Sequence, residues 1–202
     1  MVYGAILEEG NRCYTHLLEL LRAIDPMQTD FHWLITDCEC FPKSPENDER
    51  FSNEYVFLSG AALTQLVEED DFQWVWAVFS AFKKDIALEE ILKYPLPYAD
   101  GNPNFWKNPL TIQHPFAQIE IVAFDSSLTL FLSREKALVE CFKIAFPESE
   151  DLHQYNESIT TPPICNVSYI YFKTIQKVPL KVRVQEVGNP TNTLEIDANT
   201  NN

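Results

Sequence analysis

Glycine is scarce in this 202-residue chain, and so are cations and long apolar runs. The five glycines, at positions 4, 10, 60, 101 and 188, lie too far apart for the G-x-G-x-x-G, G-x-x-x-x-G-K and G-x-S-x-G motifs, which excludes those nucleotide-binding and hydrolase signatures. No apolar run approaches the roughly 20 residues that span a bilayer. The N-terminus, Met1-Val2-Tyr3-Gly4, lacks the charged and apolar regions of a signal peptide. We therefore expect a cytoplasmic protein without a membrane partner.

Positively charged residues are also few. Fifteen Lys and Arg residues face thirty Asp and Glu residues, which gives a formal net charge of −15. Such a chain repels phosphate backbones, so we expect no nucleic-acid partner and instead a basic protein partner. The five cysteines, at positions 13, 38, 40, 141 and 165, are odd in number, and a domain of this size needs no disulfides. We expect free thiols.

Apolar patterning predicts an α+β fold, with a single mixed or mostly antiparallel sheet of about five strands covered by helices. Helical spacing predicts a helix from Asn11 to Ile24, and further helices are expected after the capping residues Ser59, Asp85 and Ser133. The run Phe72 to Phe79 is apolar on both alternating faces, which predicts a central strand. Residues 37–50 are rich in proline and charge, which indicates a solvated connection. The other expected strands are 2–7, 31–36, 54–58, 116–124 and 128–132.

The C-terminal region differs in composition from this core domain of residues 1–160. Residues 161–187 predict a β-hairpin appendage packed on the core, and residues 188–202 a polar tail. In the second run Leu180, Val182 and Val184 alternate with Lys181, Arg183 and Gln185, which is typical of a sheet edge. Such an edge can pair with a second copy, as in a homodimer or an assembly subunit. Alternatively, its lysines prevent edge-to-edge contact.

Two residue groups contain the residue types of metal or catalytic sites. His32, Cys38 and Cys40 lie close together, but the C-x-C spacing lacks a second ligand pair, so we expect no metal and no cofactor. His114, Glu120 and Asp125 are the residue types of a small hydrolase or transferase, with Ser126 and Ser127 as neighbouring hydroxyls. The composition of 125–127 instead predicts a tight turn. Glu120 shares a strand face with Val122 and Phe124; we expect it to point to water, and a buried carboxyl with a raised pKa is the alternative.

An acidic run, Glu68, Glu69, Asp70 and Asp71, ends a predicted helix. Like charges there oppose the helix dipole, so stability gives no reason for them, and they are candidates for a partner-binding face. Phe105 and Trp106, in a loop rich in proline and asparagine, are candidate aromatic anchors of the same interface. The alternatives are a plain solvated turn for the acidic run and a cover over the core for the aromatic pair.

The order of segments resembles a protein family. It is carried by a helix ending in Ile24-Asp25-Pro26, then Phe31-His32-Trp33-Leu34-Ile35, then Trp74-Val75-Trp76-Ala77-Val78, and the run from Ile119 to Ser127. Over residues 1–155 the chain resembles small uncharacterised bacterial α+β proteins, of the kind often found as cytoplasmic immunity partners of secreted toxins. The resemblance implies a bacterial origin and a non-enzymatic acidic binding protein that inhibits a basic toxin. It transfers no functional residues.

Overall fold

The computed structural model describes residues 1–8 and 15–159, so the predicted hairpin (161–187), the tail (188–202) and the helix cap Asn11 lie outside the described residues. One seven-stranded antiparallel sheet and several helices make up this part of the chain, which confirms the α+β prediction. The sheet has more strands than expected. The elements are β1 (Tyr3–Leu7), α1 (Leu17–Arg22), η1 (Met27–Asp30), β2 (Phe31–Cys40), α2 (Pro45–Phe51), β3 (Tyr55–Ser59), α3 (Gly60–Glu69), β4 (Trp74–Lys83), α4 (Leu88–Ile91), η2 (Pro103–Trp106), β5 (Ile119–Phe124), β6 (Leu128–Ser133), α5 (Lys136–Ala145), β7 (Glu150–Asp151) and α6 (Leu152–Ser158).

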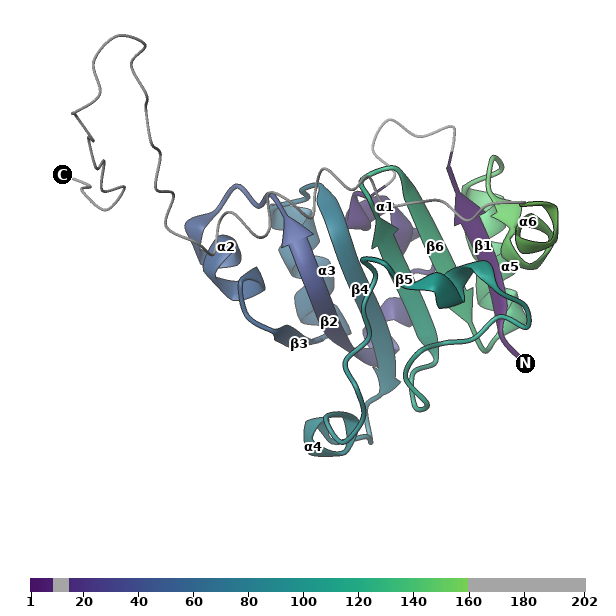
Figure 1. Cartoon of the computed structure of the whole chain (residues 1–202). Coiled ribbons are helices and arrows are strands. Elements are labelled where there is room, and N and C mark those ends of the chain that lie inside the picture. The colour runs from purple at the N-terminus through teal and green to yellow at the C-terminus, as the bar shows by residue number, and fades with distance from the viewer. Residues whose placement is uncertain (9–14, 160–202) are drawn as a thin grey trace, which may run out of the picture. The chain divides into compact units, whose positions relative to one another are not determined.

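The strands lie in the order β3-β2-β4-β5-β6-β1-β7, and each neighbouring pair is antiparallel (Figure 1). β4 lies between β2 and β5, and nine of its ten residues are buried, so the prediction of a central strand is confirmed. Among the described residues, none of the helices is long and apolar enough to cross a bilayer.

A tight turn at residues 125–127 connects β5 to β6 in an antiparallel hairpin. Asp125 and Ser126 have positive φ angles of 50° and 57°, and the Ser127 N–H donates to the Phe124 carbonyl oxygen at 3.1 Å. Two consecutive residues with positive φ make a type I′ turn, whose twist matches that of the flanking strands. The prediction that residues 125–127 form a tight turn is therefore confirmed.

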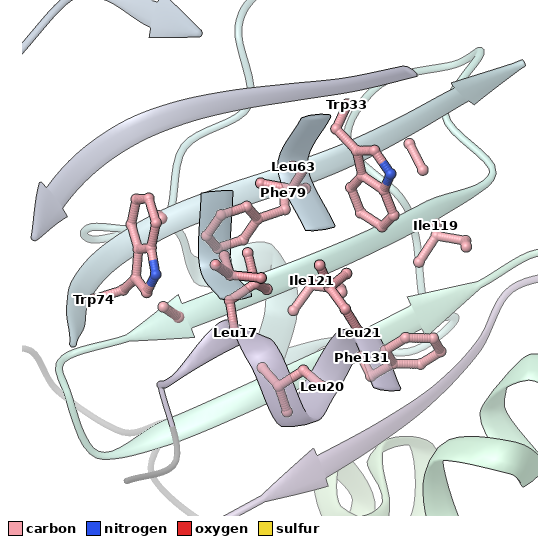
Figure 2. Packing of buried hydrophobic residues seen from close by; sticks show 14 of the residues in the cluster. Leu17, Leu20, Leu21, Trp33, Leu63, Trp74, Phe79, Ile119, Ile121 and Phe131 are labelled. Atoms are coloured by element: carbon pink, nitrogen blue, oxygen red, sulfur yellow. The ribbon is translucent and has the colours of Figure 1, made fainter. Parts of the chain in front are cut away.

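One face of the sheet packs against α1, α3 and α5. Leucines on one side of α1 and Leu63 of α3 lie over large sheet residues in this core (Figure 2). The stripe on α1 follows the helical period, as expected for a helix that is buried along one side only. The labelled members are Leu17, Leu20, Leu21, Trp33, Leu63, Trp74, Phe79, Ile119, Ile121 and Phe131.

The other face is covered by residues 84–118, which we call the cover segment. It contains α4 and η2 but is mostly irregular, and it lies on the opposite side of the sheet from α1 and α3 (Figure 1). Ring contacts connect it to the sheet: Trp106 to Phe124, with centroids 5.2 Å apart, and His114 to Phe82 at 4.8 Å. The sheet is therefore buried on both faces.

The prediction of a solvated connection over residues 37–50 is wrong. β2 continues to Cys40, and α2 begins at Pro45. The Ser44 side chain accepts a hydrogen bond from the Asn47 N–H at 3.1 Å, and Pro45 occupies the first turn, where its missing N–H costs nothing. Serine followed by proline was the local signal for this helix, and the high charge of the stretch concealed it.

The three predicted helix caps have different outcomes. Ser59 caps α3 as expected, because its Oγ accepts from the Ala62 N–H at 3.2 Å. Asp85 does not cap α4, which begins after Ala87. Ser133 does not cap α5, whose N-cap is Glu135; it is the last residue of β6, and its Oγ accepts from the Glu135 N–H at 3.0 Å.

We predict that Gly60→Ala destabilises the protein by about 3 kcal/mol, because a new Cβ at this site would lie 2.0 Å from the Gln28 carbonyl oxygen, a backbone atom of η1. Urea denaturation of the full chain measures the loss. The control is Ala61→Gly, an exposed site one residue further, where helix propensity predicts a cost of about 1 kcal/mol or less. Equal stability of the two variants would contradict the close packing of α3 on η1.

Candidate functional site

Glu120 is completely buried in the middle of the covered face. The expectation that it points to water is wrong, because the cover segment lies over the face that Glu120 shares with Val122 and Phe124. Its carboxylate accepts from the Gln113 backbone N–H at 3.1 Å and from the Gln113 Nε2 at 3.4 Å. The Ser80 hydroxyl, opposite Glu120 in the β4–β5 register, is buried without a hydrogen-bond partner in the described part of the chain.

Gln113 extends this contact into the cover segment. Its Oε1 accepts from the Tyr98 N–H and from the Asn102 Nδ2, both at 3.0 Å. Asn102 in turn donates to the Tyr98 carbonyl oxygen and accepts from the Asn104 N–H, so it organises the turn before η2. A buried chain of polar side chains therefore connects β5 to the irregular cover.

Burial raises the pKa of Glu120 to about 7, because desolvation disfavours the carboxylate. The hydrogen bonds from Gln113 and the charge of Arg134 act in the opposite direction and offset part of this effect. The Arg134 guanidinium is itself held by the carbonyl oxygens of Ala117 and Pro115, at 2.7 and 3.0 Å. Glu120 is thus a carboxyl that changes protonation near neutral pH beneath a closed cover.

His114 is buried, and both of its ring nitrogens have partners. Its Nδ1 accepts from the Phe116 N–H at 3.2 Å, so Nε2 carries the hydrogen and donates to the Ile91 carbonyl oxygen at 3.1 Å. Burial lowers its pKa, which favours this neutral form. His114 therefore joins α4 to the rest of the cover segment, and neither nitrogen is directed at Glu120.

The structure does not bring the three candidate catalytic residues together. Asp125 lies in the hairpin turn, five residues along the strand from Glu120, which corresponds to about 17 Å at the usual rise. Both ring nitrogens of His114 are hydrogen-bonded elsewhere, to Ile91 and Phe116. Ser126 donates its N–H to the Val75 carbonyl oxygen as part of the turn.

Cys38 and Cys40 lie on β2, and within the described residues neither is in a disulfide. Burial, together with the charges of Asp48 and Glu39, raises the pKa of Cys40 to about 12, so this thiol stays protonated at neutral pH. Within residues 1–8 and 15–159, no three His, Cys, Asp or Glu side chains are arranged to hold a metal ion.

Half of the acidic run has a structural role, which corrects the inference that stability gives no reason for these charges. The Asp70 Oδ2 accepts from the backbone N–H groups of Lys43 and Ser44, at 3.1 and 3.3 Å, and from the Asn47 Nδ2 at 3.3 Å. Asp70 thereby attaches the start of α2 to the end of α3. The partners lie more than twenty residues away, so the local sequence carried no signal for this contact.

Asp71 accepts a hydrogen bond from the N-terminal end of a different helix, α1. Its Oδ1 accepts from the Leu18 N–H at 3.3 Å, and its Oδ2 lies 3.2 Å from the His16 Nδ1. Leu18 is in the first turn of α1, where the backbone N–H groups lack partners within the helix. Two adjacent aspartates thus satisfy the N-terminal ends of α2 and α1, while Glu68 and Glu69 remain exposed.

Phe105 and Trp106 are buried, at 3% and 8% exposure, so the interpretation of this pair as exposed anchors is wrong. They lie in η2, and both rings pack edge-on against Phe124 of β5. The alternative of a cover over the core is what the structure shows, because a second apolar sheet face needs large side chains above it.

A groove of about 460 Å³ lies between α2 and α3. All of its lining residues lie within 43–71, a stretch with eight acidic and two basic residues and a net charge of −6; the lining itself has three acidic residues and one arginine. The single arginine of the groove, Arg50, donates to the Glu46 Oε1 at 3.1 Å and to the Asn47 Oδ1 at 3.0 Å. The lining consists of Ser44, Glu46, Asn47, Arg50, Leu58, Ala62, Gln65, Leu66, Glu69 and Asp70.

A scan against protein-family models, a search of curated proteins and a search of solved structures each gave no match to this chain. The site is therefore interpreted from its own geometry. Two features stand out: a buried titratable carboxyl beneath the cover segment, and an open groove with excess negative charge.

We predict that Asp70→Ala and Asp71→Ala each destabilise the protein by about 1 kcal/mol, because the first leaves the N–H groups of Lys43 and Ser44, just before α2, without an acceptor and the second does the same to the Leu18 N–H in α1. Glu68→Ala and Glu69→Ala, at the exposed half of the same run, change the free energy of unfolding by less than about 0.5 kcal/mol. Urea denaturation of the four variants tests this. Equal losses of stability at all four sites would refute the division of the run into two structural aspartates and two exposed glutamates.

We predict that Glu120→Gln removes a pH dependence of stability. The pKa of Glu120 is higher in the folded state than the ordinary value of 4.5, so the folded state retains its proton longer than the unfolded state. Stability from this group is therefore complete below about pH 4.5 and declines as pH rises to about 7. The variant should gain about 3 kcal/mol relative to the wild type between acidic and mildly alkaline pH.

Denaturation across this pH range, compared for the wild type, Glu120→Gln and Glu140→Gln, measures the effect. Glu140 is exposed, so its variant makes the same change of formal charge without changing a buried group. A difference between Glu120→Gln and the wild type that stays constant with pH would show that the carboxyl titrates as it does in water.

Proposed function

We propose that this protein is a non-enzymatic acidic binding protein, an immunity-type inhibitor that holds a basic protein partner at the α2–α3 groove. The observation that carries the proposal is the concentration of charge: residues 43–71, which supply the whole lining of an open groove, hold −6 of the chain's net −15, and Glu46, Glu69 and Asp70 lie in the lining itself. Acidic surfaces accelerate association with basic partners and direct the encounter, and occlusion of the partner's active site would follow from binding.

The chemistry of the groove suits lysine and arginine side chains. Glu46 and Glu69 are exposed on opposite sides, one on α2 and one on α3. The Asp70 Oδ1 is buried without a hydrogen bond in the described part of the chain, and the Lys43 Nζ lies 4.0 Å from it. Leu58, Ala62 and Leu66 add apolar surface for the aliphatic stem of a bound lysine or arginine.

The covered face supports the same proposal over a hydrolase or transferase. Glu120 has a raised pKa, which is common in catalytic acids, but it is enclosed by the cover segment and bonded to Gln113. His114 and Asp125 have other local roles. The resemblance to bacterial immunity proteins points in the same direction, and a cytoplasmic location in a bacterium is part of the proposal.

The test is an array of random octapeptides probed with the full-length protein. We expect bound peptides to be enriched in lysine and arginine and depleted in aspartate and glutamate, with binding weakened by salt. The double variant Glu46→Gln/Glu69→Gln should lose about tenfold or more in affinity, whereas Glu89→Gln/Glu140→Gln, with the same net charge but exposed changes elsewhere, should bind like the wild type. Absence of enrichment, or equal loss in both variants, would refute the proposal.

A further inference from the structure

β3 forms one edge of the sheet, next to the acidic groove. It pairs with β2 on its inner side, and no other described strand pairs with its outer side (Figure 1). In an antiparallel pair, every second residue of an edge strand directs its N–H and C=O groups away from the sheet. The outer side of β3 therefore presents backbone donors and acceptors that a further strand can use.

The two edges of the sheet differ in their protection. The opposite edge is β7, a strand of two residues that are both charged, Glu150 and Asp151. β3 is five residues long, Tyr-Val-Phe-Leu-Ser, without charge or proline, and Tyr55, Phe57 and Leu58 are only partly buried. Proteins usually protect an exposed edge with charges, proline or a bulge, because it otherwise pairs with other chains. The unprotected edge is the one beside the groove.

The register places the groove beneath an added strand. Leu58 is paired with Trp33, so it lies on the helix-covered face, and it also lines the groove. A strand added outside β3 directs alternate side chains to that face, towards the carboxylates of Glu46 and Glu69. The intervening side chains lie on the face of Phe57, which is paired with Leu34 and half-buried.

We propose that β3 accepts an extended basic segment of the partner as an additional strand, with lysine or arginine side chains alternating with apolar ones. This inference rests on the proposed function and specifies how the partner binds. Backbone hydrogen bonds to β3 supply the attachment, and the acidic groove selects the alternate cations. Pairing of β3 with β3 of a second copy is disfavoured, because it would bring two groups of residues 43–71, each with a net charge of −6, together.

The experiment uses the full-length protein and three labelled octapeptides of the sequence Thr-Lys-Val-Lys-Val-Lys-Val-Thr, with fluorescence anisotropy as the readout. One peptide is unmodified, one is N-methylated at the lysines and one at the valines. In an added strand, only one alternate set of N–H groups faces β3. We expect one methylated peptide to lose at least about tenfold in affinity and the other to bind like the unmodified peptide.

The Glu46→Gln/Glu69→Gln variant should lose affinity equally for the unmodified peptide and for the methylated peptide that still binds. The Glu89→Gln/Glu140→Gln variant should bind both peptides like the wild type. If both methylated peptides bind like the unmodified one, strand addition is refuted while electrostatic binding at the groove stands. If no lysine peptide binds, the proposed function fails as well. A concentration-dependent dimer in sedimentation velocity that excludes the peptide would make a second copy the occupant and overturn this inference.

Discussion

The constraint on which the rest of the structure depends is the burial of a sheet on both faces when helices cover only one of them. The second face is covered by mostly irregular chain, whose backbone groups need partners that helices and strands would otherwise supply. Side chains from the sheet provide them: the Thr36 hydroxyl donates to the Pro97 carbonyl oxygen at 2.7 Å, and Asp37 accepts from the N–H groups of Ala99 and Asp100. Glu120 and Gln113 continue the same attachment further along the sheet.

The polar groups that hold the cover segment explain why a carboxyl with a pKa near 7 occurs beneath it. A buried Glu costs free energy when it is ionised, yet its acceptor oxygens satisfy Gln113 in either protonation state. A raised pKa is often interpreted as evidence of catalysis. Here geometry favours a structural role, because both nitrogens of His114 are already bonded and Asp125 belongs to a turn.

The acidic run shows how one short segment serves stability and surface charge together. Asp70 and Asp71 face inward and accept hydrogen bonds from backbone N–H groups at the N-terminal ends of α2 and α1. Helices of six and seven residues are marginal without such support. Glu68 and Glu69 face solvent and add to the negative charge beside the groove. Because Leu58 of β3 lines the same groove, backbone groups without a partner among the described strands and negative charge lie together at one edge of the sheet, where the proposed partner segment would bind.

The sequence alone determined features that depend on neighbouring residues: the two-sided apolar run of β4, the turn at Asp125 and Ser126, and the Ser59 cap. Alternation and turn preferences act over a few residues, so one chain segment contains the whole signal. The acidic run from Glu68 to Asp71, two residues of which line the candidate groove, was equally visible. Only the tertiary structure decided the burial of Glu120, Phe105 and Trp106 and the capping by Asp70 and Asp71. The capping depends on contact with segments that are distant in the chain. The burial depends on which face of the sheet a long irregular segment covers. No local sequence pattern encodes either one.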